Sequence, residues 1–328
     1  MQQDQLQNLL ALLADGDYHS GSELGELLGV SRTAVWKHLQ KLAELGVELD
    51  SSRGRGYRLP GGLELLSAES INARLAKGGP PLTLEVLPLV DSTNSRLMAA
   101  ADRLPLGAVC IAEQQSAGRG RRGRTWVSPF ARNLYFSVLW RFDGGAAELE
   151  GLSLAVGVCI ADALESLGLS GVTLKWPNDV LADNKKLAGI LLEMSGDRAG
   201  ACHLVGGVGI NVEMSQASAA EIDQPWVDVA SLAQRQGLAQ ISRNELCACV
   251  LTKLAALLSQ YSAQGFAHWR ERWMARAAFL GEPVKLLTAT QETHGTFIGV
   301  DNSGALRLAS ATGEQLIYGG EVSLRSSS

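Results

Sequence analysis

Residues 20–46 impose the strongest local constraint on this chain, because they predict two short helices joined by a tight glycine turn. Ser20 and Glu23 have the spacing of a capping box at the start of the first helix, and Gly29 follows its last turn. Ser31 then stands where it can cap a second helix. This arrangement is typical of a helix-turn-helix, in which the second helix carries the side chains that read DNA.

The basic residues of this N-terminal segment all follow the glycine turn. Residues 1–31 hold five acidic and no basic residues, whereas residues 32–58 hold six basic and three acidic residues. The run VELD-SSRGRG-YRL predicts two short strands around a Gly/Arg turn, which form a wing able to reach a phosphate backbone. The side chains expected to contact DNA are Ser31, Arg32, Thr33, Trp36, Lys37, Arg53 and Arg55. The alternative is a small helical domain whose charges are only solvated.

The charge of the whole chain limits how such a domain could bind DNA. The formal net charge is −5, so any affinity for nucleic acid must come from this local basic face. A single module of this kind binds weakly. We therefore expect a homodimer on a two-fold operator.

The length of 328 residues predicts two or three domains, each with enough apolar content for a core. The most apolar long window, residues 151–171, carries Asp162 and Glu165 and predicts a buried core helix rather than a membrane span. The N-terminus lacks the basic and then apolar run of a signal peptide. The five cysteines are irregularly spaced, which favours small buried thiols over a disulfide framework or a metal site. We therefore expect a soluble cytoplasmic protein with no membrane partner.

Two breaks rich in glycine and proline, at residues 60–62 and 78–81, separate the N-terminal segment from a mixed α/β region. In that region apolar strands alternate with helical runs, notably residues 91–103 and 151–168. From about residue 276 the pattern changes to short alternating strands, which predicts a small β-barrel or, alternatively, a meander closing the preceding sheet. We expect an α+β multidomain chain with domains at residues 1–62, 63–275 and 276–328.

The stretch GRGRRGR, residues 118–124, fits the pattern G-x-G-x-x-G. The residues after it, RTWVSPFARNLYFSVLW, predict a loop and a strand in place of the helix that a dinucleotide-binding motif requires. A Walker A loop is excluded because no Gly-Lys-Ser/Thr follows. A mobile loop rich in guanidinium groups suits closure over a nucleotide phosphate, since arginine forks bind phosphate bidentately. A nucleic-acid patch fits less well, because the loop itself lacks aromatic residues for base stacking.

Three further segments carry small or polar residues where a ligand could bind. Asp91-Ser92-Thr93-Asn94 opens a predicted helix, KWPNDV precedes KLAGILLEM, and GGVGIN places three glycines inside a strand. Each segment also has a purely structural interpretation, namely a helix cap, a turn and a β-bulge.

Taken together, these motifs resemble a known family. EQQSAGRGRRGR, the Ser92-Thr93-Asn94 cap, KWPNDV, KLAGILLE and GVGINV, in this order and behind a winged helix, resemble the bacterial bifunctional biotin protein ligases and biotin operon repressors. The resemblance covers essentially the whole chain. It implies a winged helix-turn-helix, a central α/β ligase domain that binds biotin and ATP, and a small SH3-like C-terminal β-barrel.

The resemblance also implies an activity and its partners. Biotin and ATP would give biotinoyl-adenylate and pyrophosphate, and biotin would then pass to a lysine of the biotin carboxyl carrier protein of acetyl-CoA carboxylase. Mg²⁺ would bind through substrate phosphates and waters, so no protein metal ligand is predicted. The adenylate-bound homodimer would bind operator DNA and repress the biotin biosynthetic operon.

Residue roles follow from the same motif matches. The residues implied for biotin are Ser92, Thr93, Asn94, Gln115, Arg119, Gly120, Arg121, Lys186, Gly189 and Gly207. Those implied for ATP and adenylate are Arg121, Arg122, Trp126, Lys186 and Asn211, with Trp126 and Asn211 placed around adenine. Lys186, Arg119 and Arg121 are implied to be catalytic, and Lys186 in preference to its neighbour Lys185 would draw the biotin carboxylate and the α-phosphate together. Asp179 is expected to support the site rather than to react.

Three other functions remain open at this point. The chain could be a related acyl ligase that uses lipoate, although GRGRRGR together with KWPNDV matches the biotin branch. It could be a regulator that senses an adenylate without making it, against which Lys186 and the arginine loop argue. It could also be a ligase whose wing has lost DNA binding.

Overall fold

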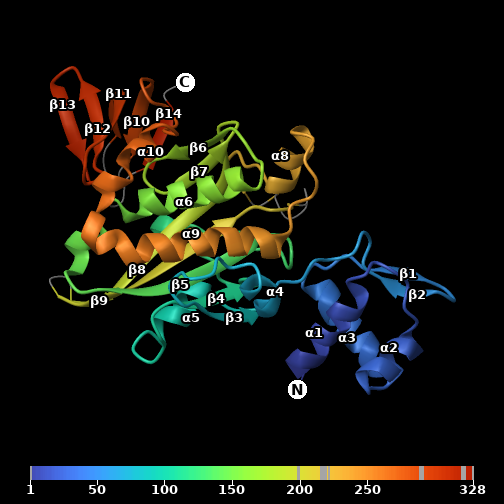
Figure 1. Ribbon diagram of the computed structural model, residues 1–328. Coiled ribbons are helices and arrows are strands. Elements are labelled where there is room, and N and C mark those ends of the chain that lie inside the picture. The colour runs from blue at the N-terminus through green and yellow to red at the C-terminus, as the bar shows by residue number, and fades with distance from the viewer. Residues whose placement is uncertain are drawn as a thin grey trace.

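The computed structural model describes residues 2–197, 200–214, 220, 222–287, 292–318 and 323–326. Within these ranges the strands form a two-stranded, a seven-stranded and a five-stranded sheet. Figure 1 shows them in chain order, from the blue N-terminal helices and wing, through the central sheet with its helices, to the red C-terminal strands.

The N-terminal part is a winged helix. Its elements are α1 (Gln2–Leu13), α2 (Gly21–Leu28), α3 (Arg32–Glu44), β1 (Asp50–Ser52) and β2 (Gly56–Arg58). The predicted capping box is present, since the Ser20 hydroxyl accepts from the Glu23 N–H while the Glu23 carboxylate accepts from the Ser20 N–H. Gly29 ends α2 in the left-handed region at φ 64°, and Ser31 caps α3. The helix-turn-helix prediction is therefore confirmed in its local structure.

The central sheet has the order β3-β4-β5-β9-β8-β7-β6. Its strands are β3 (Thr83–Leu87), β4 (Ala108–Ala112), β5 (Leu134–Phe142), β6 (Val172–Lys175), β7 (Asp179–Ala182), β8 (Lys185–Gly196) and β9 (Cys202–Ile210). Only β3 and β4 pair in parallel; the other neighbours are antiparallel. The register of β9 on both neighbours is continuous, so the glycine-rich strand contains no bulge there.

Helices cover both faces of this sheet. The helices of the region are α4 (Ala68–Asn72), α5 (Thr93–Met98), α6 (Leu152–Ser166), α8 (Val229–Arg235), α9 (Arg243–Gln264) and α10 (Arg270–Met274). Val109 and Ile111 share a hydrophobic cluster with α6 and α9, whereas Cys110 between them packs with Leu97 of α5 on the opposite face. The alternation follows from the period of two along a strand.

Three predictions, two about helices and one about the cysteines, can be compared with the structure. The apolar window 151–171 forms the buried core helix α6, as predicted. The helix expected over residues 91–103 is wrong in length, because α5 ends at Met98. Beyond it the Ala100 and Ala101 N–H groups bond three residues back, which makes turns rather than an α-helix. All five cysteines are free thiols, and the four at positions 110, 159, 202 and 247 are buried.

The C-terminal strands form an antiparallel sheet separate from the central one. Its order is β13-β12-β11-β10-β14, and the strands are β10 (Pro283–Leu287), β11 (Glu292–Val300), β12 (Leu306–Ser310), β13 (Gly313–Ile317) and β14 (Ser323–Ser326). Among the described residues β13 and β14 stay at opposite edges, so the sheet is open and the expected closed barrel is not formed there. The alternative of a meander continuing the central sheet is wrong, because the two sheets share no ladder within the described strands.

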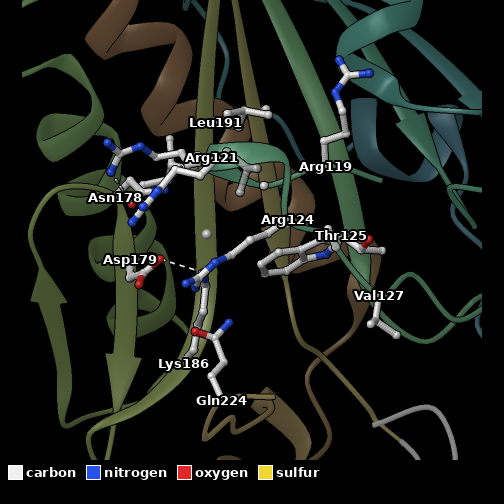
Figure 2. A pocket seen from close by; sticks show the side chains of 18 of the residues that line it. Arg119, Arg121, Arg124, Thr125, Val127, Asn178, Asp179, Lys186, Leu191 and Gln224 are labelled. Carbon is white, nitrogen blue, oxygen red and sulfur yellow. Dashed lines mark hydrogen bonds and ion pairs between the residues drawn. The ribbon is translucent and has the colours of Figure 1, made fainter. Parts of the chain in front are cut away.

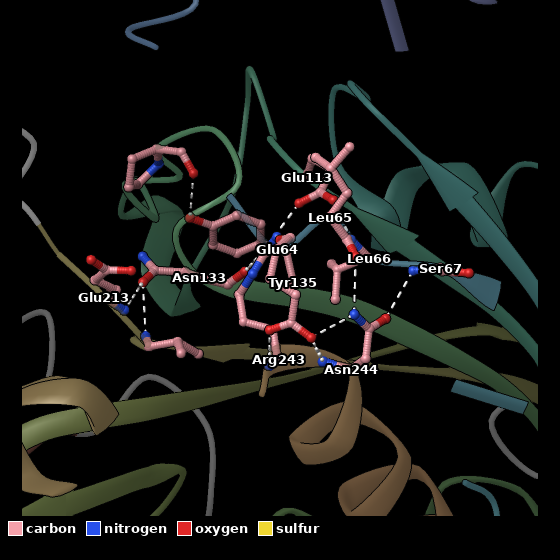
Figure 3. A network of polar contacts seen from close by, with 12 residues as sticks. Glu64, Leu65, Leu66, Ser67, Glu113, Asn133, Tyr135, Glu213, Arg243 and Asn244 are labelled. Atoms are coloured by element: carbon pink, nitrogen blue, oxygen red, sulfur yellow. Dashed lines mark hydrogen bonds and ion pairs between the residues drawn. The ribbon is translucent and has the colours of Figure 1, made fainter. Parts of the chain in front are cut away.

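A buried polar network joins the winged helix to the central sheet (Figure 3). Arg243, the first residue of α9, donates to the Glu113 carboxylate at 2.8 Å and to the Asn133 carbonyl at 3.0 Å, and the Arg243 and Glu113 side chains are both 5% exposed. Glu64, just past the winged helix, accepts from the Ser242 hydroxyl at 2.5 Å and the Arg243 N–H at 2.6 Å. The segment that leaves the winged helix is therefore fastened to the ends of β4 and β5.

Candidate functional site

A cavity of about 270 Å³ lies over the glycine-rich parts of β8 and β9. Its walls come from α5, the arginine loop, the β6–β7 turn and the segment before α8. All residues implied for biotin or adenylate line it: Ser92, Thr93, Asn94, Gln115, Arg119, Gly120, Arg121, Arg122, Trp126, Lys186, Gly189, Gly207 and Asn211. Four segments far apart in the sequence, within residues 92–94, 115–126, 186–189 and 207–211, are thus brought to one site.

One end of the cavity is lined by neutral polar side chains from the start of α5 and from Gln115. The Thr93 N–H and hydroxyl both point to the Gln115 side-chain oxygen, at 2.9 and 3.2 Å. Ser137 of β5 donates to the Asn94 side-chain oxygen at 2.5 Å and lies 2.7 Å from the Thr93 hydroxyl. Ser92 caps α5 through its hydroxyl. These groups are fixed before any ligand arrives, so this end can bind a neutral head group that both donates and accepts hydrogen bonds.

The orientation of Asn94 is set by an acidic residue that the sequence motifs did not single out. The Asn94 side-chain nitrogen donates to Glu193 of β8 at 2.7 Å and to the Leu191 carbonyl at 3.3 Å. Glu193 also pairs with Arg119 at 3.2 Å, and Arg119 donates to the Ser95 hydroxyl at 2.9 Å. Ser137 and Glu193 lie in the interior of long strands, and only the register of β5, β8 and β9 brings them to the site.

The strand glycines leave space for side chains of the protein itself. A Cβ atom on Gly209 would come within 2.5 Å of the Trp126 ring, and one on Gly189 within 2.9 Å of it. A Cβ atom on Gly207 would collide with the Asn94 side chain. These glycines were expected to let the ligand approach the sheet. The structure places Trp126 against Gly189 and Gly209, and Asn94 against Gly207.

The other end of the cavity is charged. Asp179, at the start of β7, pairs with both Lys175 and Lys186, each at 2.8 Å. Figure 2 shows Asp179 and Lys186 side by side. Burial would raise the pKa of the Asp179 carboxyl, but the two ammonium groups outweigh this effect and hold it at about 2. Asp179 therefore stays ionised and fixes both lysines, which agrees with a supporting rather than a reacting role. Lys185 beside them is exposed, whereas Lys186 lines the cavity.

The arginine loop folds over this charged end as a small hairpin. Arg119 and Thr125 form a β-bridge, and the Gly120 N–H donates to the Arg124 carbonyl at 2.7 Å. Arg121 reaches the Asn178 side-chain oxygen at 3.3 Å, whereas Arg119 points away from it toward α5 (Figure 2). Burial lowers the pKa of Arg121, although the nearby Asp179 charge opposes this. A half-buried guanidinium of this kind gains from an anionic ligand beside it.

Two residues placed around adenine differ in their contacts. The Asn211 side-chain nitrogen donates to the Lys186 and Val227 carbonyls, each at 3.2 Å, so it holds the backbone beside the site. The buried Trp126 indole nitrogen has no hydrogen-bond partner among the described residues, and Lys186 lies 5.3 Å from the ring centre. Trp226, which lines the same wall and pairs with Lys186 through a β-bridge, was missed. The sequence feature that could have indicated Trp226 is the run QPW, residues 224–226, directly before Val227 and Asp228. Both of these residues are buried in the structure.

The residues predicted to contact DNA are all exposed on the winged helix. Ser31, Arg32, Thr33, Trp36 and Lys37 of α3 and its cap are exposed, with Trp36 at 52%. Arg53 and Arg55 are exposed in the wing, where Arg55 stacks on the Tyr18 ring at 4.0 Å. The Ser31 hydroxyl is occupied by capping.

Comparison with known proteins gives three family matches along the chain. Residues 86–211 match the biotin/lipoate A/B protein ligase family, residues 5–58 match an HTH domain, and residues 279–325 match the biotin protein ligase C-terminal domain.

Individual relatives match over most of the chain. It is 42% identical over 318 residues to the bifunctional ligase/repressor BirA of Escherichia coli (strain K12), covering 97% of this chain and 96% of the relative. It is 38% identical over 242 residues to the biotin–[acetyl-CoA-carboxylase] ligase of Paracoccus denitrificans, covering 72% of this chain and 98% of that relative. The biotin protein ligase of Aquifex aeolicus, solved in complex with biotin and ATP, superimposes with a TM-score of 0.64 at 32% identity, covering 75% of this chain and 99% of that one.

Proposed function

Because the chain belongs to the biotin protein ligase family, in the branch of the bifunctional ligase/repressors, we propose that it joins biotin to a carrier protein and uses ATP to do so. We also propose that it represses transcription when the adenylate is bound. The observation that carries the ligase function is the asymmetry of the cavity. Thr93, Asn94 and Gln115 form its uncharged polar end, and Lys175, Lys186 and Arg121 lie at its cationic end. Biotin has a neutral ureido ring at one end and a carboxylate at the other.

The first half-reaction joins the two substrates at the cationic end. A biotin carboxylate oxygen attacks the α-phosphorus of ATP, the bond to the β-phosphate breaks, and pyrophosphate leaves. Catalysis of this step is mostly positioning and charge stabilisation, since two anions must meet. Lys186 lies where it can neutralise both, Asp179 keeps its ammonium group in place, and Arg121 covers the phosphate from the loop. Mg²⁺ would accompany the ATP phosphates.

The second half-reaction transfers the biotinoyl group. The amine of a carrier lysine attacks the acyl carbon of the adenylate, AMP leaves, and the amine gives up a proton. No protein nucleophile is required, so the intermediate must be shielded from water instead. The arginine loop is placed to do this. The proposed acceptor is the biotin carboxyl carrier protein of acetyl-CoA carboxylase, the enzyme named in the Paracoccus relative.

Intact-mass spectrometry of a biotin carrier domain tests the ligase function. The carrier is incubated with this protein, Mg²⁺ and ATP, with biotin in one tube and lipoate in another. We expect a biotin-sized mass gain that needs ATP, because a dithiolane ring offers the polar end no hydrogen-bond partners. Lys186→Ala should abolish adenylate formation, and Lys185→Ala, on the exposed neighbour, is the matched control. A gain with lipoate alone, or none with either acid, would refute the proposal.

The second function is operator binding through the winged helix. It is supported by the exposed Arg32, Trp36 and Lys37 on α3 and by the wing arginines Arg53 and Arg55. A homodimer formed with the adenylate bound would place two such surfaces on one two-fold site. A gel-shift assay on the promoter DNA of the biotin genes should show binding that strengthens with biotin and ATP. Binding that is unchanged by Trp36→Ala and Arg55→Ala together would contradict this surface.

The remaining features of the proposal concern organisation and location. We place the winged helix at residues 1–62, the ligase domain at residues 63–275 and a C-terminal domain at residues 276–328; the family matches at residues 5–58, 86–211 and 279–325 each fall within one of these ranges. A cytoplasmic location suits a DNA-binding enzyme that uses ATP, and it agrees with the five free thiols.

A further inference from the structure

The turn between β6 and β7 is held from two sides. Inside the hairpin, Lys175 and Asp179 are opposite each other and form the ion pair that fixes the charged end of the cavity. Between them, Trp176 is 1% exposed and its indole N–H donates to the Gly304 carbonyl at 3.0 Å. Gly304 belongs to the C-terminal sheet, in the β11–β12 turn. A residue of the active-site turn therefore depends on a different sheet for its hydrogen bond.

The position of the Gly304 carbonyl is set by Asp301. One Asp301 carboxylate oxygen accepts from the Ser303 N–H, the Ser303 hydroxyl and the Ala305 N–H, each at 2.9 Å. Gly304 has φ 86°, and a Cβ atom there would lie 2.7 Å from the backbone of Gly151. The turn is thus rigid, and its fit against the central domain leaves no room for adjustment.

Other contacts bring the same two parts together. The Leu174 N–H donates to the Arg276 carbonyl at 2.7 Å, and the Ala278 N–H donates to the Leu174 carbonyl at 2.9 Å. Figure 1 shows β6 and β7 on the side of the central sheet that faces the C-terminal strands. Leu174 directly precedes Lys175, so the β6 side of the β6–β7 turn is held by the C-terminal part of the chain at two positions, Leu174 and Trp176.

We propose that Asp301 is a positioning residue for adenylate formation: through the Gly304 carbonyl and the Trp176 indole it fixes the turn on which Asp179 holds Lys175 and Lys186. The inference rests on the proposed ligase function and extends it to the C-terminal sheet. The uncharged end of the cavity is carried by α5 and the segment after β4, near the opposite edge of the central sheet. Loosening the turn therefore affects the charged end and leaves biotin binding largely intact.

The test is a double-mutant cycle with Asp301→Ala and Trp176→Phe in the full-length protein. Pyrophosphate release gives kcat and the KM for biotin, and calorimetry gives the biotin Kd. Each single variant should lower kcat about tenfold, since small displacements of catalytic groups cost this much. Biotin Kd should change less than twofold. The double variant should be no slower than the worse single one, because Trp176→Phe removes the hydrogen bond to Gly304 and Asp301→Ala acts only by loosening the turn that carries its acceptor.

Controls separate this inference from loss of folding and from failure of the proposed function. Asp301→Asn keeps an oxygen that can accept the three bonds and should restore kcat. Glu314→Gln removes an exposed ion pair with Arg307 in the same sheet and should match the parent protein. Wild-type kcat in both single variants, additive losses in the double variant, or equal losses in Asp301→Asn would overturn the inference. A parent protein that releases no pyrophosphate would refute the ligase function instead.

Discussion

The ion triad of Asp179, Lys175 and Lys186 gives the sharpest prediction. The carboxyl pKa falls from its ordinary 3.8 to about 2 in the folded chain. At about 1.36 kcal/mol per pKa unit this lowering corresponds to roughly 2–3 kcal/mol of stabilisation at pH 7. Asp179→Asn removes this stabilisation and leaves the ammonium groups of Lys175 and Lys186 without the carboxylate between them. We expect the free energy of unfolding to fall by about 2–3 kcal/mol.

Urea unfolding followed by circular dichroism measures this change. The exposed pair of Asp183 and Arg235 supplies the control, because Asp183→Asn should cost about 0.5 kcal/mol or less. Adenylate formation by Asp179→Asn should also slow by about tenfold or more, since Lys186 loses its fixed position. If Asp179→Asn unfolds at the urea concentration of the parent, the triad does not stabilise the fold and the argument is wrong.

The pH dependence follows from the sign of the pKa shift. Because the folded-state pKa of Asp179 lies below the unfolded value, its contribution to stability is fully present above about pH 5 and declines as the pH falls through 4 toward 2. The difference between parent and Asp179→Asn should therefore shrink between pH 5 and pH 3. A difference that stays constant over this range would contradict the shifted pKa.

Three further outcomes are expected. Gly207→Ala should displace Asn94 and raise the biotin KM about tenfold, whereas Gly206→Ala, whose Cβ would meet its nearest neighbour at 3.4 Å, should leave KM unchanged in the same pyrophosphate assay. Arg121→Ala should release the adenylate about tenfold faster in a filtration assay, because the loop loses its half-buried cation over the phosphate. Burial alone would raise the pKa of Glu64, but its hydrogen bonds outweigh this and lower it, so Glu64→Gln should lose about 1 kcal/mol at pH 7 in urea unfolding and progressively less below about pH 4.5.

The sequence predicted the local structure well where short-range chemistry decides it. The Ser20 and Glu23 capping box, the Gly29 terminator and the Ser31 cap each depend on atoms within a few residues, and all are present. The apolar strands were likewise found from their composition. The length of α5 was predicted wrongly, because the sequence from Ala99 to Arg103 is compatible with a helix and only the structure shows that the Ala100, Ala101 and Arg103 N–H groups bond three residues back.

Only part of the candidate site could be predicted from the sequence, because some of its residues reach the site only through the register of the strands. Segments with local signals, such as the Ser92 cap, the arginine loop and the glycines of β9, do line the cavity. Ser137 and Glu193 orient Asn94 from inside two long strands, and their role depends on register across β5, β8 and β9. The same holds for the link from Trp176 to Gly304, which joins residues 128 positions apart.

The arginine loop and the winged helix are held in place by some of the same contacts. The loop leaves β4 at Glu113 and returns at Ala131, and these residues are joined by the Ala131 N–H to the Glu113 carbonyl at 3.0 Å. The Glu113 carboxylate accepts from the Leu66 N–H, next to the chain that leaves the winged helix, and Phe130 packs in the hydrophobic cluster of the winged helix itself. The same contacts therefore hold both the arginine loop and the winged helix within one subunit, and a displacement of the loop would act on contacts that also hold the winged helix in place.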